Sequence, residues 1–370
     1  MIQRKKKGVI ILRWIVSESS LSQYTNDNGV YQDGTLAFCR DKDGVLWALL
    51  GHSHLGGVSL WKGTSVDDMQ KQCYIEYNFH LGEAGKAFDG TFYPDGPRSR
   101  GQIWPYGLWI DPEDGRFYCF IHNETGWGAK ETSYTVFGLN EGEPDFRHIG
   151  LMTSDDQGKS WDFRGWIITS NKPCWSEHYR PDGMQGGQRG RDIFLCAGDF
   201  TLYVNHKDGY FYIFYTQIEH NIDTKSCYDR IYAARAPIES KGLPGSWKKL
   251  YNGSFSEPGN MGKESPVVEN ANVPCISYNY YLNKYIMTSY RRDCWVSGKG
   301  ACQVAFSDDL VNWSKPELLA PDRKDLSKPY FTICNTEKEG MHNETGKTFR
   351  LFMESNGTDV EKADVTICLD

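Results

Sequence analysis

The chain has 370 residues, of which 14% are aromatic and 38 are glycine, a mixture typical of many short strands joined by turns. A formal net charge of −7 argues against a nucleic-acid partner and suits a neutral substrate. No stretch has the long 3.6-residue apolar period of a helical domain, and no apolar run is long enough to span a membrane.

The amino-terminal stretch, residues 4–12, places a basic cluster before a short apolar run that Arg13 interrupts. We interpret it as a basic end leading into a strand, with a degenerate export signal as the alternative, so the compartment stays open. Eleven cysteines are scattered without a C-x-x-C pair, which argues against structural zinc. Those inside apolar strands are expected to be buried thiols, and two others bracket a loop and can pair in an oxidising compartment. The first set is Cys39, Cys119 and Cys196, and the second is Cys294 and Cys302.

In chain order, the strand signals form five groups, at residues 30–62, 102–161, 198–250, 264–315 and 331–353. The first three contain aromatic and β-branched runs that turn at an Asp-Gly pair: Asp43-Gly44, Asp114-Gly115 and Asp208-Gly209. Five such groups predict an all-β fold, a five-bladed β-propeller that occupies residues 1–370 as a single domain. The segments 63–101 and 128–148 are expected to be insertions beside the funnel mouth.

Two turns carry a recognisable pattern. Residues 154–161 fit S-x-D-x-G-x-S/T-W, the Asp-box of sialidase-type propellers, and residues 307–313 form a related turn. In this pattern a carboxylate and a glycine fix a tight turn between outer strands, and the tryptophan packs between blades. We therefore expect these residues to be structural.

Three acidic residues, Asp33, Asp199 and Glu264, each come just before a predicted hairpin. Because the innermost strand of every blade lines the central cavity, we expect the three carboxylates to converge there. Cleavage of a glycosidic bond needs one ionised carboxylate to activate water and one protonated carboxyl for the leaving oxygen. A further carboxylate nearby keeps the acid protonated. Alone, each residue can simply begin a turn or cap a loop; the joint placement favours a site.

Around these residues the sequence resembles glycoside hydrolase family 43 and its relatives, a clan of five-bladed propellers that includes arabinanases, xylosidases and invertase-like enzymes. The resemblance spans roughly residues 30–353 and implies that Asp33 is the general base, Asp199 the pKa modulator and Glu264 the general acid. The family usually has Asp-Pro where this chain has Asp33-Gly34 and Asp199-Phe200, and Glu-Gly-Pro or Glu-Cys-Pro instead of Glu-Ser-Pro. The motifs that carry it are Asp33 with its hairpin, Ile103-Trp104-Pro105, Gly198–Tyr203 with Asp208-Gly209, and Glu264-Ser265-Pro266.

Other polar and aromatic residues fall at the ends of predicted strands, where loops carry specificity. We expect the sugar site to be lined by His52, Trp104, His122, Glu124 and Arg292. Glu124 is also an alternative acid. Tryptophans at 104, 127, 175 and 295 pack between blades more often than they form sugar platforms. The pairs Arg147-His148 and Arg291-Arg292 can clamp an anionic group such as a uronate.

His52 and His54 alone are weak support for a metal site. No metal or cofactor is therefore expected, with a structural calcium left open.

The expected function is hydrolysis of a furanose- or pentose-containing oligosaccharide or polysaccharide. Inversion is expected because the hairpin around Asp33 resembles the inverting branch, and Asp27, in Asn26-Asp27-Asn28-Gly29, is the rival base or nucleophile. One alternative is a sialidase-like hydrolase, which lacks support from an Arg-x-Pro start or a three-arginine set. The other is a carbohydrate-binding propeller without catalysis. The sugar, endo or exo action and the oligomeric state stay open.

Overall fold

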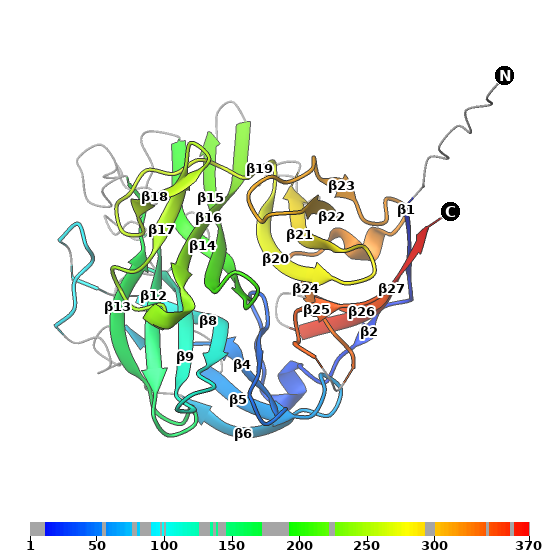
Figure 1. Ribbon diagram of the computed structural model, residues 1–370, viewed down its shortest axis with the longest axis horizontal. Coiled ribbons are helices and arrows are strands. Elements are labelled where there is room, and N and C mark those ends of the chain that lie inside the picture. Colours follow the sequence, from blue (N-terminus) through cyan, green and yellow to red (C-terminus); the bar gives the residue numbers. More distant parts are fainter. Residues whose placement is uncertain are drawn as a thin grey trace.

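The computed structural model is a ring of five sheets of mainly antiparallel strands, a five-bladed β-propeller (Figure 1). The described helices are the short 3₁₀ turns η1 (Asn26–Asn28), η4 (Ile238–Ser240) and η5 (Lys324–Ser327), and none of them is long and apolar enough to cross a membrane. The structure describes residues 12–53, 57–75, 80–81, 90–96, 98–99, 101–125, 134–135, 138–139, 146–171, 192–221, 226–292, 300–337, 340–355 and 359–369.

Blade I runs outward from the axis in the order of the sequence. Its strands are β3 (Ala37–Arg40), β4 (Leu46–His52), β5 (Gly57–Gly63) and β6 (Gln70–Ile75). Strand β6 lies inside the segment 63–101 that the sequence predicts to be an insertion, so the insertion is shorter than expected. Its polar start, Gln70-Lys71-Gln72, is exposed at the outer edge of the sheet and has no apolar alternation to reveal it.

Blade II follows the same plan and adds a short strand at its inner edge. Its strands are β7 (His80–Leu81), β8 (Gly101–Ile110), β9 (Phe117–Glu124), β12 (Arg147–Ser154) and β13 (Asp162–Ile168). Between β9 and β12, within the expected insertion 128–148, β10 (Tyr134–Thr135) pairs with β11 (Gly138–Leu139). The insertion ends before Arg147, because β12 begins at that residue.

Blade III has the longest strands. They are β14 (Asp192–Asn205), β15 (Tyr210–Asn221), β16 (Ser226–Pro237), β17 (Lys248–Tyr251) and β18 (Ser254–Pro258), and β19 (Val268–Glu269) pairs with β16. The position of β19 corrects the sequence prediction that residues 264–268 open the fourth blade. They complete blade III instead.

Blade IV begins at Asn272. Its strands are β20 (Asn272–Asn279), β21 (Lys284–Arg292), β22 (Gly300–Ser307) and β23 (Glu317–Leu318), with β25 (Glu344–Thr345) parallel to β20.

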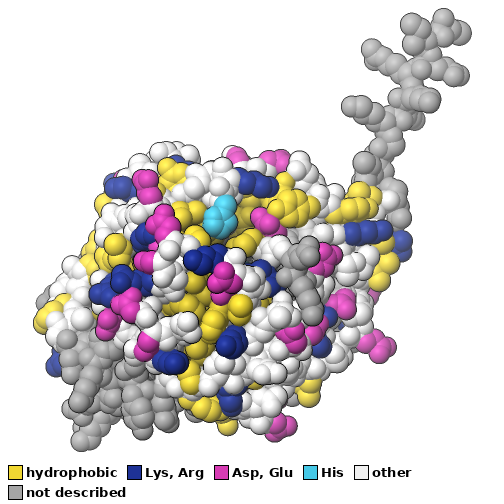
Figure 2. Space-filling view, turned by 60° about the horizontal axis from the view of Figure 1, so that its bottom comes forward, with side chains coloured by type: hydrophobic (Ala, Val, Ile, Leu, Met, Phe, Trp, Pro, Cys, Tyr) yellow, Lys and Arg dark blue, Asp and Glu magenta, His cyan; other side chains and the backbone are white. Residues whose placement is uncertain are grey.

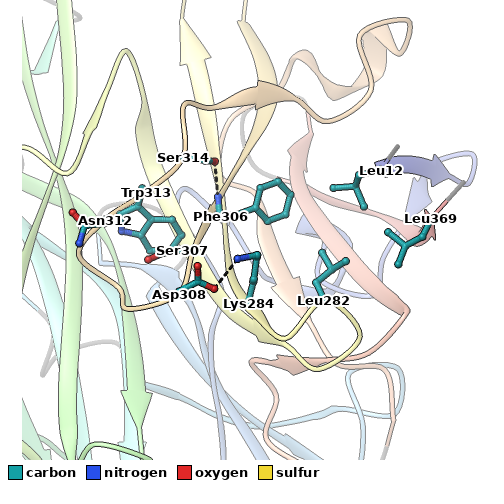
Figure 3. Close-up of a pocket in the computed structure, with 10 residues that line it drawn as sticks. All are labelled: Leu12, Leu282, Lys284, Phe306, Ser307, Asp308, Asn312, Trp313, Ser314 and Leu369. Carbon is teal, nitrogen blue, oxygen red and sulfur yellow. Dashed lines mark hydrogen bonds and ion pairs between the residues drawn. The ribbon is translucent and has the colours of Figure 1, made fainter. Parts of the chain in front are cut away.

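Blade V closes the ring by joining the two ends of the chain. Its strands are β24 (Thr332–Cys334), β26 (Thr348–Ser355), β27 (Asp359–Leu369) and β1 (Leu12–Val16), and β2 (Ser20–Leu21) also pairs with β27. Leu12 lies opposite Leu369, and Figure 1 shows β1 in blue beside β27 in red. A groove near this seam, on the outer rim, is lined by Leu12, Leu282, Phe306, Trp313 and Leu369 together with the Lys284–Asp308 ion pair (Figure 3).

The core consists of five apolar clusters, one between each pair of neighbouring blades. Alternation along the strands produces this arrangement, since successive side chains point to opposite faces of a sheet. In β8, Leu108 and Ile110 pack toward blade I, whereas Trp109 packs against Phe211 of blade III. The thiols of Cys39, Cys119, Cys196 and Cys302 are buried and free, and Cys294 lies outside the described residues.

The turn at residues 154–161 joins β12 to β13, at the outer side of blade II. A carboxylate oxygen of Asp156 accepts hydrogen bonds from the N–H groups of Lys159 (3.0 Å) and Ser160 (2.9 Å). The indole of Trp161 donates to the Gly158 carbonyl (2.9 Å) and is buried in the cluster between blades I and II. These contacts hold the turn and the neighbouring blade together. Elsewhere on the surface, Figure 2 shows acidic and basic side chains intermixed over the face that it presents.

Candidate active site

A narrow cavity of about 30 Å³ follows the propeller axis, a volume that suits about one water molecule. All five blades contribute to its wall, because each innermost strand faces the axis. Its apolar lining includes Ala37, Leu108, Leu202, Ile276 and Ile333, and its polar lining includes Tyr106, Thr201 and Thr332. Asp33 and Asp199 lie just before the residues of blades I and III that line this cavity. The cavity therefore ends at the candidate site.

Asp199 is placed by a bulge in β14. The pairing register with β15 shifts between Gly198 and Phe200, and Asp199 has the left-handed backbone angle φ +40°. The bulge turns its buried carboxylate toward blade II. There Oδ1 lies 3.3 Å from the Tyr106 hydroxyl, and Oδ2 accepts a hydrogen bond from the Arg147 guanidinium. Blade III thus presents a carboxylate that blade II holds in place.

Arg147 of β12 bridges two buried carboxylates. Besides Asp199, it pairs with Glu124, with 3.0 Å between Nη2 and Oε1. The sequence suggested Arg147 as a clamp for an anionic substrate; the structure shows this guanidinium engaged by the protein's own acids. The donor atoms of His122, Glu124 and Asp199 lie within 4.8 Å of one another, which is close enough to share one cation. The guanidinium group of Arg147 places a positive charge beside Glu124 and Asp199.

His122 connects the same cluster through both ring nitrogens. Nδ1 accepts the backbone N–H of Asp199 at 3.1 Å, and Nε2 lies 3.0 Å from Oε1 of Glu124. Because Nδ1 accepts, the neutral ring carries its proton on Nε2 and donates it to Glu124. His122 therefore connects the backbone of Asp199 to the carboxylate of Glu124.

Asp33 approaches from blade I and is half-buried. The Tyr106 hydroxyl lies 3.1 Å from its backbone carbonyl, so one phenol links Asp33 and Asp199. Burial, followed by the negative charges of Glu124 and Asp199, raises the pKa of Asp33 to about 6, and a hydrogen bond with Tyr330 opposes the increase. Three carboxylates from blades I, II and III therefore interact here.

Gly34 explains why this chain departs from the Asp-Pro pattern of the resembling family. Its φ of +144° is a conformation that proline, fixed near −65°, is unable to adopt. A Cβ atom at this position would also overlap the Tyr106 ring. Glycine is therefore needed for the phenol to reach both Asp33 and Asp199.

Replacing Gly34 by Ala is expected to lower the free energy of unfolding by about 2 kcal/mol or more, from backbone strain and overlap with Tyr106. The displaced phenol should also reduce activity. Gly44→Ala is the matched control, because Gly44 has φ +81° but open space around its Cβ position. Urea unfolding of both variants separates the two effects; equal losses would show that contact with Tyr106 is unimportant.

Glu264 lies in the connection between β18 and β19, and its side chain is 5% exposed. Its carboxylate is 2.9 Å from Nζ of the buried Lys249 and accepts hydrogen bonds from Tyr215 and Gln217. These partners belong to β15 and β17. Within the described part of the chain, no hydrogen bond or ion pair joins Glu264 to Asp33. Its role as general acid stays a prediction.

Among the other expected sugar contacts, His52 stacks on Trp104 with ring centroids 5.2 Å apart, and Trp104 meets the edge of His122 at 5.4 Å. Both His52 and Trp104 are buried, and through Trp104 they pack against His122 of the acidic cluster. Direct contact of either residue with a sugar stays a prediction. Outside the described residues lie the side chain of Arg292 and all of Trp127, Trp175 and Trp295.

Asp27, the rival base, is exposed in η1. The carbonyl of the following Asn28 accepts a hydrogen bond from Lys71 of β6, the outer strand of blade I. This position favours Asp33 over Asp27.

Sequence reasoning missed a backbone feature shared by the inner strands. All five blades have a left-handed residue at or just before the strand that lines the axis: Gly34, Gly101, Asp199, Val273 and Tyr330. Strained residues of this kind cluster at functional sites. Thr216 links two of them, because its hydroxyl donates to the Asp199 carbonyl at 3.1 Å and lies 2.9 Å from the Val273 nitrogen, whose N–H it accepts. Only the two glycines carried a signal for this conformation in the sequence.

No protein-family model matches this sequence, and no curated protein is significantly similar to it. Solved structures are similar in fold. A family 117 glycoside hydrolase from the marine bacterium Zobellia galactanivorans aligns with a TM-score of 0.52 and 9% identity, over 96% of this chain and 90% of that one. A thermostable family-43 glycoside hydrolase aligns with a TM-score of 0.47 and 12% identity, over 94% of this chain and 92% of that one. An exo-β-1,3-galactanase from Phanerochaete chrysosporium aligns with a TM-score of 0.49 and 9% identity, over 94% of this chain and 64% of that one. At 9% identity, the likeness to the family 117 enzyme concerns the fold alone.

Proposed function

We propose that the protein is a glycoside hydrolase that acts on a furanose- or pentose-containing glycan at the central funnel, where blades I, II and III meet. The observation that carries the proposal is the meeting of Asp33, Asp199 and Glu124 from three blades at one end of the axial cavity. The sequence resemblance and the similar fold of the family 117 hydrolase support it.

Asp33 fits the role of general base. It is the partly exposed member of the cluster, so a water molecule can reach it. With a pKa of about 6 it is mostly ionised at neutral pH, yet basic enough to accept a proton from water. Asp199 is buried against Arg147 and acts as a fixed negative charge beside Asp33.

The two residues expected as proton donor, Glu264 and Glu124, are both paired with a cation. In blade III, the ammonium group of Lys249 lies 2.9 Å from Glu264 and stabilises its negative charge. Glu124, the alternative acid, pairs with Arg147 in the same way. A general acid must hold a proton before the reaction, so both ion pairs work against this role.

A screen of nitrophenyl glycosides and of arabinan-, xylan- and fructan-type polymers tests the proposal. We expect turnover of at least one pentose or furanose substrate, and proton NMR should show a first-formed product of inverted anomeric configuration. A retained configuration would contradict inversion. Binding of a glycan without turnover would identify a carbohydrate-binding propeller, and release of sialic acid from a sialoside would favour the sialidase alternative.

A further inference from the structure

A second half-buried carboxyl group, that of Glu354, lies in the blade next to the one that carries Asp33. Glu354 lies near the end of β26, the second strand of blade V, and blade V is the neighbour of blade I in the ring. Glu124 ends β9, the strand that follows β8 in blade II, and His52 ends β4, the strand that follows β3 in blade I. Glu354 therefore occupies, in blade V, a position similar to those that build the candidate site in blades I and II.

A short backbone segment connects Glu354 to Asp33. The N–H of Glu354 donates to the Pro329 carbonyl at 3.3 Å. The next residue, Tyr330, has φ +61° and hydrogen-bonds through its side chain to the Asp33 carboxylate. The left-handed turn at Tyr330 thus brings the phenol to Asp33 while its neighbour holds Glu354.

Burial and the charge of Asp33 together favour the protonated form of Glu354. Burial, followed by the negative charge of Asp33, raises the pKa of Glu354 to about 8, and Lys328 opposes the increase. Lys328 is already engaged, because its ammonium lies 2.7 Å from Glu361 of β27 and 3.2 Å from the Ser355 hydroxyl. Glu264, in contrast, has the buried Lys249 as a direct partner.

We propose that Glu354 is the proton donor of the hydrolysis, acting together with Asp33 of the neighbouring blade, and that Glu264 is a positioning residue. This inference rests on the proposed function. As the bond between C1 and the glycosidic oxygen breaks, Glu354 gives its proton to that oxygen. Water adds to C1 and loses a proton to Asp33. Exchange with solvent then returns a proton to Glu354 and removes one from Asp33, so the site is restored.

Leaving-group dependence tests this assignment. Glu354→Gln is expected to lower kcat/KM at least about 100-fold for a glycoside with an alkyl or sugar leaving group, which needs protonation. The loss should be less than about 10-fold for the 4-nitrophenyl glycoside, whose leaving group departs as an anion. The alkaline limb of the wild-type profile of kcat/KM against pH, expected near pH 8, should disappear in the variant. Glu337→Gln, at an exposed position after β24, is the matched control and should behave as wild type.

The same measurements on Glu264→Gln complete the test. If that variant shows the leaving-group dependence and loses the alkaline limb, while Glu354→Gln resembles wild type, the assignment is overturned although the enzyme remains a hydrolase. No turnover by the wild type would overturn the proposed function, and the assignment with it.

A second measurement needs no substrate. The Glu354 carboxyl, followed by carbon-13 NMR, should titrate near pH 8 and shift to lower pH in Asp33→Asn, because that change removes a neighbouring negative charge. An unchanged titration would contradict the coupling between the two carboxyls. Thermal melting confirms that each variant is folded.

Discussion

Replacing Asp33 by Asn is expected to reduce kcat by about 10²–10⁴-fold, because the amide is unable to accept a proton from the attacking water. The effect should be similar for good and poor leaving groups, since both need the water activated. In the wild type, kcat/KM should fall on the acid side of about pH 6, where Asp33 becomes protonated. The measurement is a pH series with the best substrate of the screen, and the variant's residual rate should lack that acid limb.

The same substitution should stabilise the fold at neutral pH. Burial raises the pKa of Asp33 from its ordinary value to about 6, so the folded state binds this proton more tightly than the unfolded state does. Ionisation of Asp33 therefore lowers the free energy of unfolding as the pH rises from about 4 to above 6. Asparagine has no such cost, and the advantage of the variant over the wild type should grow across that interval.

Asp43→Asn is the matched control for both effects. Asp43 is exposed in the turn between β3 and β4, so it offers the same chemical change on the same blade without burial. It should leave both the rate and the pH dependence of stability unchanged. An Asp33→Asn enzyme with a normal rate would remove Asp33 from the mechanism and return attention to Asp27.

The blades could be predicted from the sequence because their signal is local. Asp-Gly turns mark the inner hairpins of blades I, II and III, and apolar runs mark their strands, which are buried on both faces. The outermost strand β6 escaped because it faces solvent and pairs with only one neighbour. The sequence therefore predicted the number of blades better than the limits of each blade.

The position of Glu264 shows where a short motif is insufficient. Glu-Ser-Pro looked like the opening of blade IV, but that blade's inner strand begins at Asn272, eight positions later (272 − 264 = 8). There Val273, with φ +50°, takes the place that Asp199 has in blade III. Asn272 is buried with its amide bound to Asp229, and an amide is no proton donor for a leaving group. Which strand follows a motif depends on sheet pairing, which the motif itself does not encode.

The pairing of Arg147 with two acids was also beyond the sequence. Arg147, Glu124 and Asp199 come from different strands, and they meet because the bulge at Asp199 redirects one side chain. The sequence suggested Arg147 as part of a clamp for an anionic substrate, and not as a partner of the protein's own acids. Tyr106 and Tyr330 were hidden for a similar reason, because their contacts with Asp33 depend on the left-handed turns at Gly34 and Tyr330.

Replacing Arg147 by Met should be the most destabilising change in the candidate site. It leaves the carboxylates of Glu124 and Asp199 buried without their cation, which is expected to lower the free energy of unfolding by about 3–5 kcal/mol. The loss should be smaller in acid, because protonation of either carboxylate relieves the repulsion between them. The added negative potential should also raise the pKa of Asp33 and move the acid limb of kcat/KM above pH 6.

Arg116→Met tests whether burial is the reason. Arg116 also forms an ion pair, 2.6 Å from Asp155, but these side chains are 40% and 62% exposed. Its removal should therefore destabilise the fold far less than the removal of Arg147 does. Urea unfolding of both variants at pH 5 and at pH 8 provides the comparison. If Arg147→Met costs no more than Arg116→Met, or costs the same at both pH values, the cluster is not held by the charge of Arg147. In that case the acid limb of kcat/KM should also stay near pH 6 in the variant.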